Sequence, residues 1–180
     1  MEQTRVGIIG ATGYSGRELI KLLSRHNKIK LTLLSSRTEM GIPVKNYFPF
    51  LDKNLSQLIF SNIDINEIRE KCDLVFFATP SGTAKDLAPL LYKQGLKVID
   101  ISGDFRLSTV EDYQKWYKYD HPHPDLLNEV VYCIPEINRN EAKNSLFISN
   151  PGCYPTSILL PLVPVIQSLK FQGTVLIDAK

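Results

Sequence analysis

The chain has 180 residues, which suits one domain and the start of a second, and its apolar fraction of 43% is enough to build a buried core. The formal net charge is only +2, from 21 basic and 19 acidic residues, so no basic field predicts a nucleic-acid partner. The 3 cysteines show neither a pairing pattern nor metal-ligand spacing, which predicts free thiols in a reducing compartment and no metal site.

No segment of the sequence predicts a membrane partner. The short apolar run at residues 6–9 lacks a cleavage-site pattern and is interpreted as a first strand, not as a signal peptide. The apolar residues 158–166 are too few to cross a bilayer, and they include Pro161 and Pro164. Together with the free thiols, these features predict a cytoplasmic protein.

Apolar runs and helical patterns alternate from the N-terminus onward. Strands are predicted, in chain order, at residues 6–9, 31–34, 74–78, 98–101, 146–148 and 174–177. Helices are predicted at residues 15–25, 65–70, 81–94 and 153–169, the third with Ser81 as its N-cap and Gly95 as its stop. The polar and aromatic residues 108–129 are predicted to leave the sheet. This alternation predicts an α/β fold with a doubly wound, mostly parallel, Rossmann-like sheet.

The first strand runs directly into a glycine-rich turn that opens the first helix, Gly10-Ala11-Thr12-Gly13-Tyr14-Ser15-Gly16. Backbone N–H groups at such a helix start bind the pyrophosphate of a dinucleotide. The spacing is GxxGxxG rather than the commoner GxGxxG, and a plain strand-to-helix turn is the alternative. We predict a dinucleotide site that includes Gly10, Thr12, Gly13, Tyr14, Ser15 and Gly16.

The residues after the second strand predict which dinucleotide binds. An NAD site usually places an acidic residue there, about 20 residues beyond the glycines, on the ribose 2′-hydroxyl. This chain has Ser35, Ser36 and Arg37 instead, and a guanidinium beside hydroxyls suits a 2′-phosphate. We predict that Ser36 and Arg37 select NADP(H), and that Thr79 and Pro80 also contact the cofactor. The alternative for Arg37 is a solvated surface residue.

A second candidate functional motif lies near the end of the sequence, in Ser149-Asn150-Pro151-Gly152-Cys153-Tyr154-Pro155-Thr156. An apolar strand runs into a Pro-Gly corner, and Cys153 follows at the start of a predicted helix. A helix N-terminus carries about half a positive charge and unpaired N–H groups, which favour the nucleophilic thiolate. A nucleophilic cysteine beside a nicotinamide predicts aldehyde or acyl redox chemistry through a thioester.

The remaining cysteines and the histidines are interpreted as structural. Cys72 and Cys133 are predicted to be buried packing residues. His121 and His123 match no zinc-site spacing and are predicted to lie in a solvated loop. His26 is predicted near the C-terminal end of the first helix, where it suits the helix dipole.

Asp104 and Arg106 stand just past the carboxyl end of a predicted strand. That is the ligand side of such a sheet, so one of the two is a candidate for a functional role. A structural ion pair that holds the loop is the alternative.

Four runs of the sequence resemble the N-acetyl-gamma-glutamyl-phosphate reductase family of arginine biosynthesis. They are Gly10-Ala11-Thr12-Gly13-Tyr14-Ser15-Gly16-Arg17-Glu18-Leu19, Ser102-Gly103-Asp104-Phe105-Arg106-Leu107, Val131-Tyr132-Cys133-Ile134-Pro135-Glu136 and Asn150-Pro151-Gly152-Cys153-Tyr154-Pro155-Thr156, in the family's order. Two residues depart from the family pattern, since Gly103 is more often Ala and Cys133 more often Gly. A wider resemblance, through Ser149, Asn150 and Cys153, is to aspartate-semialdehyde and glyceraldehyde-phosphate dehydrogenases.

The resemblance implies that Cys153 attacks the acyl carbon of N-acetyl-glutamyl 5-phosphate, that phosphate leaves, and that NADPH reduces the resulting thioester to the 5-semialdehyde. Backbone N–H groups after Gly152 are expected to stabilise the oxyanion. Arg106 and Asn150 are expected to bind the substrate, a small-molecule acyl phosphate, and the protein is expected to be a homo-oligomer. The family uses a histidine as acid and base, and none of the 3 histidines here sits in a matching motif.

Family members continue beyond Lys180. The resemblance therefore implies a dinucleotide-binding domain at residues 1–150, and then, at residues 151–180, the nucleophile helix and the beginning of an α+β substrate domain. Two alternatives stay open. One is a related dehydrogenase that acts on aspartyl or aminoadipyl phosphate, and the other is an NADP-binding module without catalysis.

Overall fold

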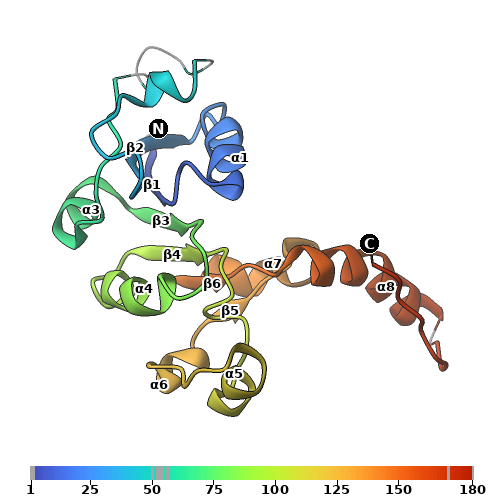
Figure 1. Cartoon of the computed structure of the whole chain (residues 1–180). Coiled ribbons are helices and arrows are strands. Elements are labelled where there is room, and N and C mark those ends of the chain that lie inside the picture. The colour runs from blue at the N-terminus through green and yellow to red at the C-terminus, as the bar shows by residue number, and fades with distance from the viewer. Residues whose placement is uncertain (1–2, 50, 52–54, 56, 170, 180) are drawn as a thin grey trace.

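The computed structural model of the chain describes residues 3–49, 51, 55, 57–169 and 171–179. Its centre is one sheet of 6 strands in the order β2-β1-β3-β4-β6-β5 (Figure 1). Every neighbouring pair is parallel, so the predicted Rossmann-like α/β fold is confirmed. The strands are β1 (Thr4–Ile9), β2 (Ile29–Ser35), β3 (Leu74–Phe77), β4 (Lys97–Asp100), β5 (Val131–Tyr132) and β6 (Phe147–Ser149).

Helices form most of the connections between the strands. They are α1 (Tyr14–Leu23), α3 (Ile65–Lys71), α4 (Ala84–Lys93), α5 (Val110–Tyr117), α6 (Pro124–Leu127), α7 (Pro135–Asn144) and α8 (Cys153–Leu169), with a 3-10 helix η1 (Val44–Asn46). The four predicted helices are confirmed, and residues 108–129 leave the sheet as α5 and α6. Helix α7 and strand β5 were not predicted. No described helix is long and apolar enough to cross a membrane.

Two hydrophobic clusters pack against the sheet. One cluster joins helices α3, α4 and α5 to the strands through Ile68, Phe77, Leu91, Tyr113 and Phe147. The other joins α1 and the segment before α3 to the strands through Val6, Ile8, Ile20, Leu34 and Phe60. Successive side chains of β3 enter opposite clusters, as expected for a parallel sheet that is covered on both faces.

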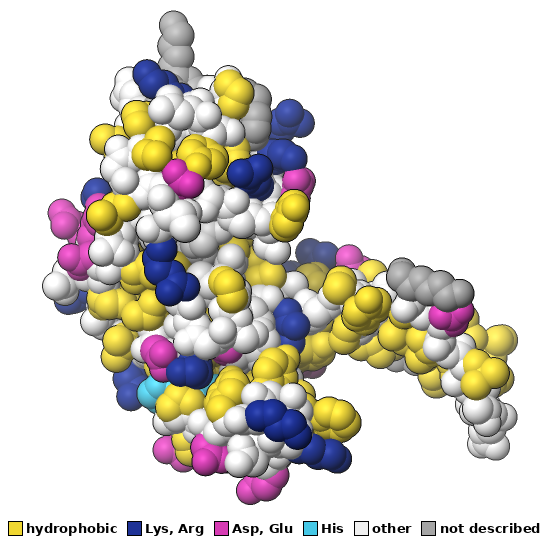
Figure 2. All heavy atoms as spheres, viewed as in Figure 1, with side chains coloured by type: hydrophobic (Ala, Val, Ile, Leu, Met, Phe, Trp, Pro, Cys, Tyr) yellow, Lys and Arg dark blue, Asp and Glu magenta, His cyan; other side chains and the backbone are white. Residues whose placement is uncertain are grey.

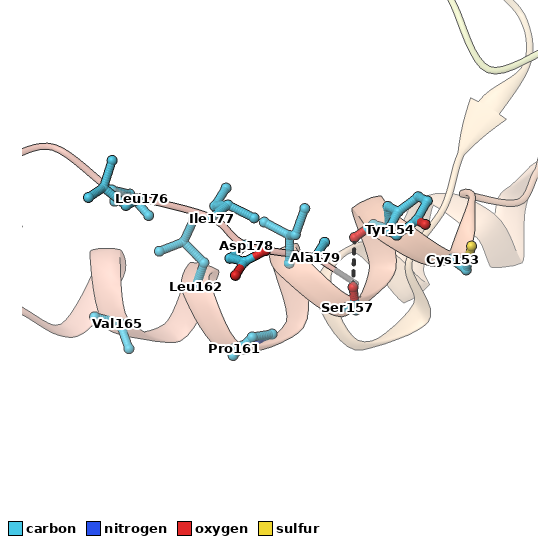
Figure 3. Close-up of a pocket in the computed structure, with 12 residues that line it drawn as sticks. Cys153, Tyr154, Ser157, Pro161, Leu162, Val165, Leu176, Ile177, Asp178 and Ala179 are labelled. Atoms are coloured by element: carbon cyan, nitrogen blue, oxygen red, sulfur yellow. Dashed lines mark hydrogen bonds between the residues drawn. The ribbon is translucent and has the colours of Figure 1, made fainter.

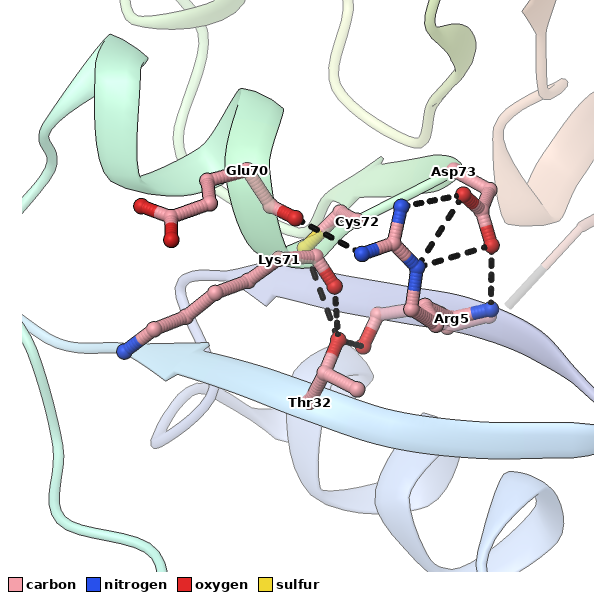
Figure 4. Close-up of polar contacts among 7 residues, drawn as sticks. Arg5, Thr32, Glu70, Lys71, Cys72 and Asp73 are labelled. Carbon is pink, nitrogen blue, oxygen red and sulfur yellow. Dashed lines mark hydrogen bonds and ion pairs between the residues drawn. The ribbon is translucent and has the colours of Figure 1, made fainter.

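A polar network joins the amino ends of the strands, at the edge away from the glycine-rich turn (Figure 4). Arg5 of β1 forms an ion pair with Asp73 at 2.7 Å and donates a hydrogen bond to the Glu70 carbonyl. The Thr32 hydroxyl of β2 donates to the Lys71 carbonyl at 2.7 Å. Because Arg5 and Asp73 are both partly solvated, their ion pair adds little stability, and the network mainly ties the end of α3 to β1 and β2.

The predicted strand at residues 174–177 is wrong, since these residues form no strand. A strand needs a hydrogen-bonding neighbour. This segment instead runs along α8, and Leu176 is 93% exposed. Helix α8 projects from the body of the molecule and has no fully buried side chain, so it forms an arm with apolar side chains on its surface (Figures 1 and 2).

Candidate active site

The carboxyl ends of the parallel strands lie at one edge of the sheet, and the chain changes direction across the sheet between β1 and β3. Ligands of open α/β sheets bind at such a switch point. A cleft of about 200 Å³ lies there. The predicted cofactor residues that line it are Gly10, Thr12, Gly13, Ser36, Arg37, Thr79 and Pro80.

The glycine-rich turn is shaped by close backbone contacts. Gly10 has a φ of +86°, and a Cβ there would collide with the Ala78 carbonyl oxygen of the neighbouring turn. A Cβ on Gly16 would collide with the Gly10 carbonyl oxygen, so this glycine lets α1 pack directly on the turn. A side chain at either position would force the turn and the cleft apart.

The start of α1 fits a phosphate group. The predicted residues Tyr14, Ser15 and Gly16 do not line the cleft with their side chains, but they form the first turn of α1, whose N–H groups have no partner within the helix. The cap residue Gly13 offers no side-chain hydrogen bond, and no acidic residue lies in this turn. The N–H groups and the positive end of the helix dipole are therefore left for an anion.

Hydroxyl and guanidinium groups gather at the β2 side of the cleft. The Ser36 hydroxyl is buried, 3.0 Å from the Thr12 hydroxyl and 3.3 Å from that of Thr38. Arg37 is exposed, and its Nη2 donates to the Thr83 hydroxyl at 3.4 Å. Arg17, which was not predicted as a cofactor residue, donates through its Nε to the Thr12 carbonyl at 3.0 Å. These groups fit a phosphate on the ribose.

Thr79 supplies a further indication that the cleft fits a ligand. Its hydroxyl oxygen is buried and has no hydrogen-bond partner among the described residues. A buried hydroxyl without a partner costs free energy, so a polar ligand group in the cleft would find an acceptor or donor there.

Asp104 does not pair with Arg106, because no described ion pair joins them. Its side chain is fully buried and accepts from the backbone N–H of Gly82 at 2.7 Å and from that of Lys85 at 3.0 Å. Asp104 therefore caps α4, and the predicted Ser81 cap is wrong because α4 starts later, at Ala84. The Ser81 hydroxyl accepts from the Gly103 N–H instead.

The Asp100–Arg106 segment also holds the backbone before Cys153. Arg106 Nε donates to the Asn150 carbonyl at 3.0 Å, and Nη2 donates to the Ile101 carbonyl at 2.6 Å. The Asn150 N–H donates to the Asp100 carbonyl at 2.7 Å. Both backbone groups of Asn150 are thus fixed. Arg106 and Asn150, predicted to bind substrate, are brought together beside Cys153.

Cys153 is the first residue of α8, and its side chain is exposed. The Thr156 N–H and hydroxyl both donate to the Gly152 carbonyl, at 3.1 and 2.9 Å, which fixes the first turn. Cys153 lies at one end of an apolar groove of about 830 Å³ between α8 and residues 175–179 (Figure 3). The thiol is therefore open to a reactant.

The other two thiols are buried, as predicted. Cys72 and Cys133 are each 2% exposed. Burial raises the pKa of both thiols, so less of the reactive thiolate is present near neutral pH.

The prediction of a solvated loop is wrong for His121, which is 3% exposed. Rings of Phe105, Tyr113 and Tyr119 surround it. Its Nδ1 accepts from the His123 N–H at 3.1 Å, so Nε2 carries the proton and donates to the Asp104 carbonyl at 2.9 Å. Burial lowers the pKa of His121, which keeps the ring neutral.

The histidines therefore offer no acid or base at the thiol. His121 has both ring nitrogens engaged. His26 lies beyond the end of α1, just before β2, at the amino edge of the sheet. His123 lies in the connection to α6, where it precedes the helix without capping it through its side chain.

Comparison with known proteins agrees with this geometry. Residues 5–145 match the family model of the semialdehyde dehydrogenase NAD binding domain, and the chain belongs to this family. It is 45% identical over 98% of its length to an N-acetyl-gamma-glutamyl-phosphate reductase of a Psychrobacter species, and 46% identical over 98% to that of Thiobacillus denitrificans. The chain covers 50% and 51% of these two relatives, about half their length.

Solved structures share the fold. An aspartate semialdehyde dehydrogenase with NADP from Candida albicans matches with a TM-score of 0.71 and 18% identity, over 92% of this chain and 47% of that one. An aspartate semialdehyde dehydrogenase II from Vibrio cholerae matches with a TM-score of 0.66 and 22% identity, over 93% and 47%.

The buried His121 predicts a pH dependence of stability. Its pKa in the folded state is below the 6.5 of a free histidine, so the unfolded chain binds the proton more readily, and stability falls as the pH drops below 6.5. Replacing His121→Gln should reduce this fall, measured by urea unfolding at pH 7.5 and 5.5 (values about one unit on either side of 6.5). His26→Gln is the exposed control.

Asp100 contributes a pH dependence of stability of the opposite sign. Burial raises its pKa from 3.8 to about 6, so its contribution to stability is lost as the pH rises through about 6. Asp100 is present in the wild type, in His121→Gln and in His26→Gln, so differences among the three proteins report on the histidine that was replaced. An equal fall in stability in the wild type and in His121→Gln would contradict the prediction.

The exposures of the three cysteines predict that Cys153 reacts first. With limiting iodoacetamide near neutral pH, the adduct should form at Cys153 and be located there by mass spectrometry, because Cys72 and Cys133 are shielded. In Cys153→Ser the native chain should label slowly, and after unfolding the two remaining thiols should label readily. Preferential native labelling of Cys72 or Cys133 is the contrary outcome.

Proposed function

We propose that the chain is the cofactor-binding and nucleophile-bearing N-terminal portion of an NADPH-dependent N-acetyl-gamma-glutamyl-phosphate reductase. The reaction is reduction of N-acetyl-glutamyl 5-phosphate to N-acetyl-glutamate 5-semialdehyde, with release of phosphate. The observation that carries the proposal is the exposed Cys153 at a helix start, close to the Arg106–Asn150 hydrogen bond, in a chain that is 45% identical to an enzyme of that name.

The residues support NADP(H) as the cofactor. The start of α1 has no side-chain cap and no acidic residue, which suits a pyrophosphate. Ser36, Arg37 and Thr38 suit a 2′-phosphate, since they offer hydroxyl and guanidinium donors at the end of β2. The structurally similar aspartate semialdehyde dehydrogenase from Candida albicans was solved with NADP.

In the proposed mechanism, the Cys153 thiolate attacks the acyl carbon, and the carbon–oxygen bond to phosphate breaks to leave a thioester. The N–H groups of Cys153 and Tyr154 belong to the first turn of α8 and are placed to stabilise the oxyanion, because Pro155 has no N–H and Thr156 already bonds within the helix. A bound NADPH would supply the hydride that reduces the thioester carbon. Collapse of the resulting adduct releases the aldehyde and restores the thiolate.

Two substrate contacts are proposed. Arg106 carries a positive charge next to the corner that holds Cys153, and its Nη1 lies toward Gly152, since a Cβ built on that glycine would be 3.1 Å from it. A guanidinium there suits the phosphate of the substrate. The Asn150 side chain donates to the Pro151 carbonyl at 3.3 Å, a long bond that a substrate carbonyl could replace.

Residues 151–180 are proposed to belong to a substrate domain, distinct from the dinucleotide-binding domain of residues 1–150. The exposed apolar surface of α8 supports this division, because such surface is normally covered by further protein. It also supports assembly as a homo-oligomer. The free thiols support a cytoplasmic location.

The cofactor proposal predicts tighter binding of NADP(H) than of NAD(H). In calorimetric titrations, Arg37→Ala should weaken NADP+ binding by about tenfold or more, the effect of losing a charge-assisted hydrogen bond, and leave NAD+ binding nearly unchanged. Lys45→Ala, an exposed cation on η1, is the matched control. Equal affinities of the wild type for both dinucleotides would contradict the assignment.

The proposed reaction is tested in reverse, with N-acetyl-glutamate 5-semialdehyde, phosphate and NADP+, by the absorbance of the reduced cofactor. This chain alone should turn over poorly, because a missing acid and base costs roughly 10²–10⁴-fold. Continuing it with the second half of the Thiobacillus denitrificans relative should restore activity.

Within that chimera, Cys153→Ala should abolish turnover, whereas Cys133→Ala, at a buried thiol, should retain most of it. Two outcomes count against the proposal. One is full activity of the Cys153→Ala chimera. The other is a chimera that folds and binds NADP+ but oxidises aspartate semialdehyde faster than N-acetyl-glutamate 5-semialdehyde.

A further inference from the structure

At the carboxyl edge of the sheet, one loop forms hydrogen bonds to two other segments and so joins them. The joining segment is residues 100–106, which starts at Asp100, the last residue of β4, and β4 lies between β3 and β6 in the sheet. On one side it bonds to the turn that runs from β3 into α4. On the other side it bonds to Asn150, which follows β6. The cofactor side and the thiol side of the site thus share one support.

Asp104 makes the bonds to the cofactor side. Its carboxyl oxygens accept from the N–H groups of Gly82 and Lys85, and its side chain is 0% exposed. These residues lie in the same turn and the start of α4, a few positions after Thr79 and Pro80, which line the cleft. Buried acceptors with backbone donors at fixed positions leave the turn little freedom to move.

Further bonds hold Asp104 itself in place. Its carbonyl accepts from His121 Nε2 at 2.9 Å, and its N–H donates to the Ser102 hydroxyl at 3.2 Å. The Ser102 hydroxyl in turn donates to the Asp100 carboxyl at 3.0 Å. Asp100 also accepts, through its backbone carbonyl, from the Asn150 N–H. A continuous path of hydrogen bonds therefore runs from Gly82 to Asn150.

We propose that Asp104 is a positioning residue, which fixes the turn after β3 and the backbone before Cys153 relative to each other. It touches neither reactant. It acts through Gly82 and Lys85 on one side, and through Ser102 and Asp100 on the other. That one side holds the cofactor and the other side holds the nucleophile rests on the proposed function.

The test compares Asp104→Asn with Asp86→Asn in this chain. Asp86 lies in the first turn of α4, is exposed and pairs with Lys85, so it matches the charge change on the same helix. Three quantities are measured on folded protein: the dissociation constant of NADP+, the rate of Cys153 alkylation by iodoacetamide, and amide hydrogen exchange at Gly82, Lys85, Asn150 and Ile8. Ile8, in the core of β1, reports global opening.

In Asp104→Asn, an amide N–H group replaces one acceptor and faces backbone N–H donors. We expect NADP+ affinity to fall by about tenfold. Cys153 alkylation should slow by about threefold or more, because the start of α8 loses its fixed geometry. Exchange at Gly82, Lys85 and Asn150 should accelerate by about tenfold beyond the change at Ile8. Asp86→Asn should change none of these.

A purely structural role would accelerate exchange equally at all four amides and leave the affinity and alkylation rate of the folded protein within about twofold of Asp86→Asn; that result overturns the proposal. If Asp104→Asn does not fold, Ser102→Ala decides. Loss of the Ser102 hydroxyl should both weaken NADP+ binding and slow Cys153 alkylation. If the affinity and the alkylation rate both stay unchanged, the proposal is overturned.

The proposed function can fail separately. If the wild type does not bind NADP+, or Cys153 is not the first thiol to react, the function is wrong. The exchange measurement then still tests the positioning role, because the hydrogen bonds of Asp104 are made without a cofactor. If amide exchange in Asp104→Asn accelerates at Gly82 but not at Asn150, the positioning role alone is overturned.

Discussion

The hydrogen bonds of residues 100–106 are the constraint on which the geometry of the site depends. The parallel sheet brings the ends of β1, β3, β4 and β6 to one edge, but it does not fix how the turns beyond these ends face one another. Buried polar groups must find partners, and here those partners belong to neighbouring turns. Satisfying Asp104 and Asn150 therefore also sets the distance between the dinucleotide cleft and the cysteine.

The sequence predicts those parts of the site that depend on local pattern. The glycine-rich turn, Ser36 with Arg37, and the corner before Cys153 each combine a strand end with residues a few positions away, and the structure brings them to one edge of the sheet. The Asp104 cap was missed because its donors lie 22 and 19 residues earlier in the chain. His121 was misjudged because much of the aromatic shell that buries it comes from Phe105 and from α5.

The same holds for the fold: elements with a clear local pattern were predicted, and those that depend on distant partners were not. Long apolar runs between turn residues identified strands β1, β3 and β4, of which β1 and β3 contribute side chains to both hydrophobic clusters. Strand β5 has only two residues, too short for a recognisable pattern. Residues 174–177 have the composition of a strand, but a strand exists only where a neighbour pairs with it, and composition does not supply the neighbour.

A crystal structure of this chain with bound NADP+ tests the central claim most directly. The account predicts the pyrophosphate at the start of α1, the 2′-phosphate against Ser36 and Arg37, and the nicotinamide passing Thr79 toward Cys153. The bonds from Asp104 to Gly82 and from Arg106 to Asn150 should remain in place. A dinucleotide bound elsewhere, or one whose nicotinamide points away from Cys153 while these bonds persist, would contradict it.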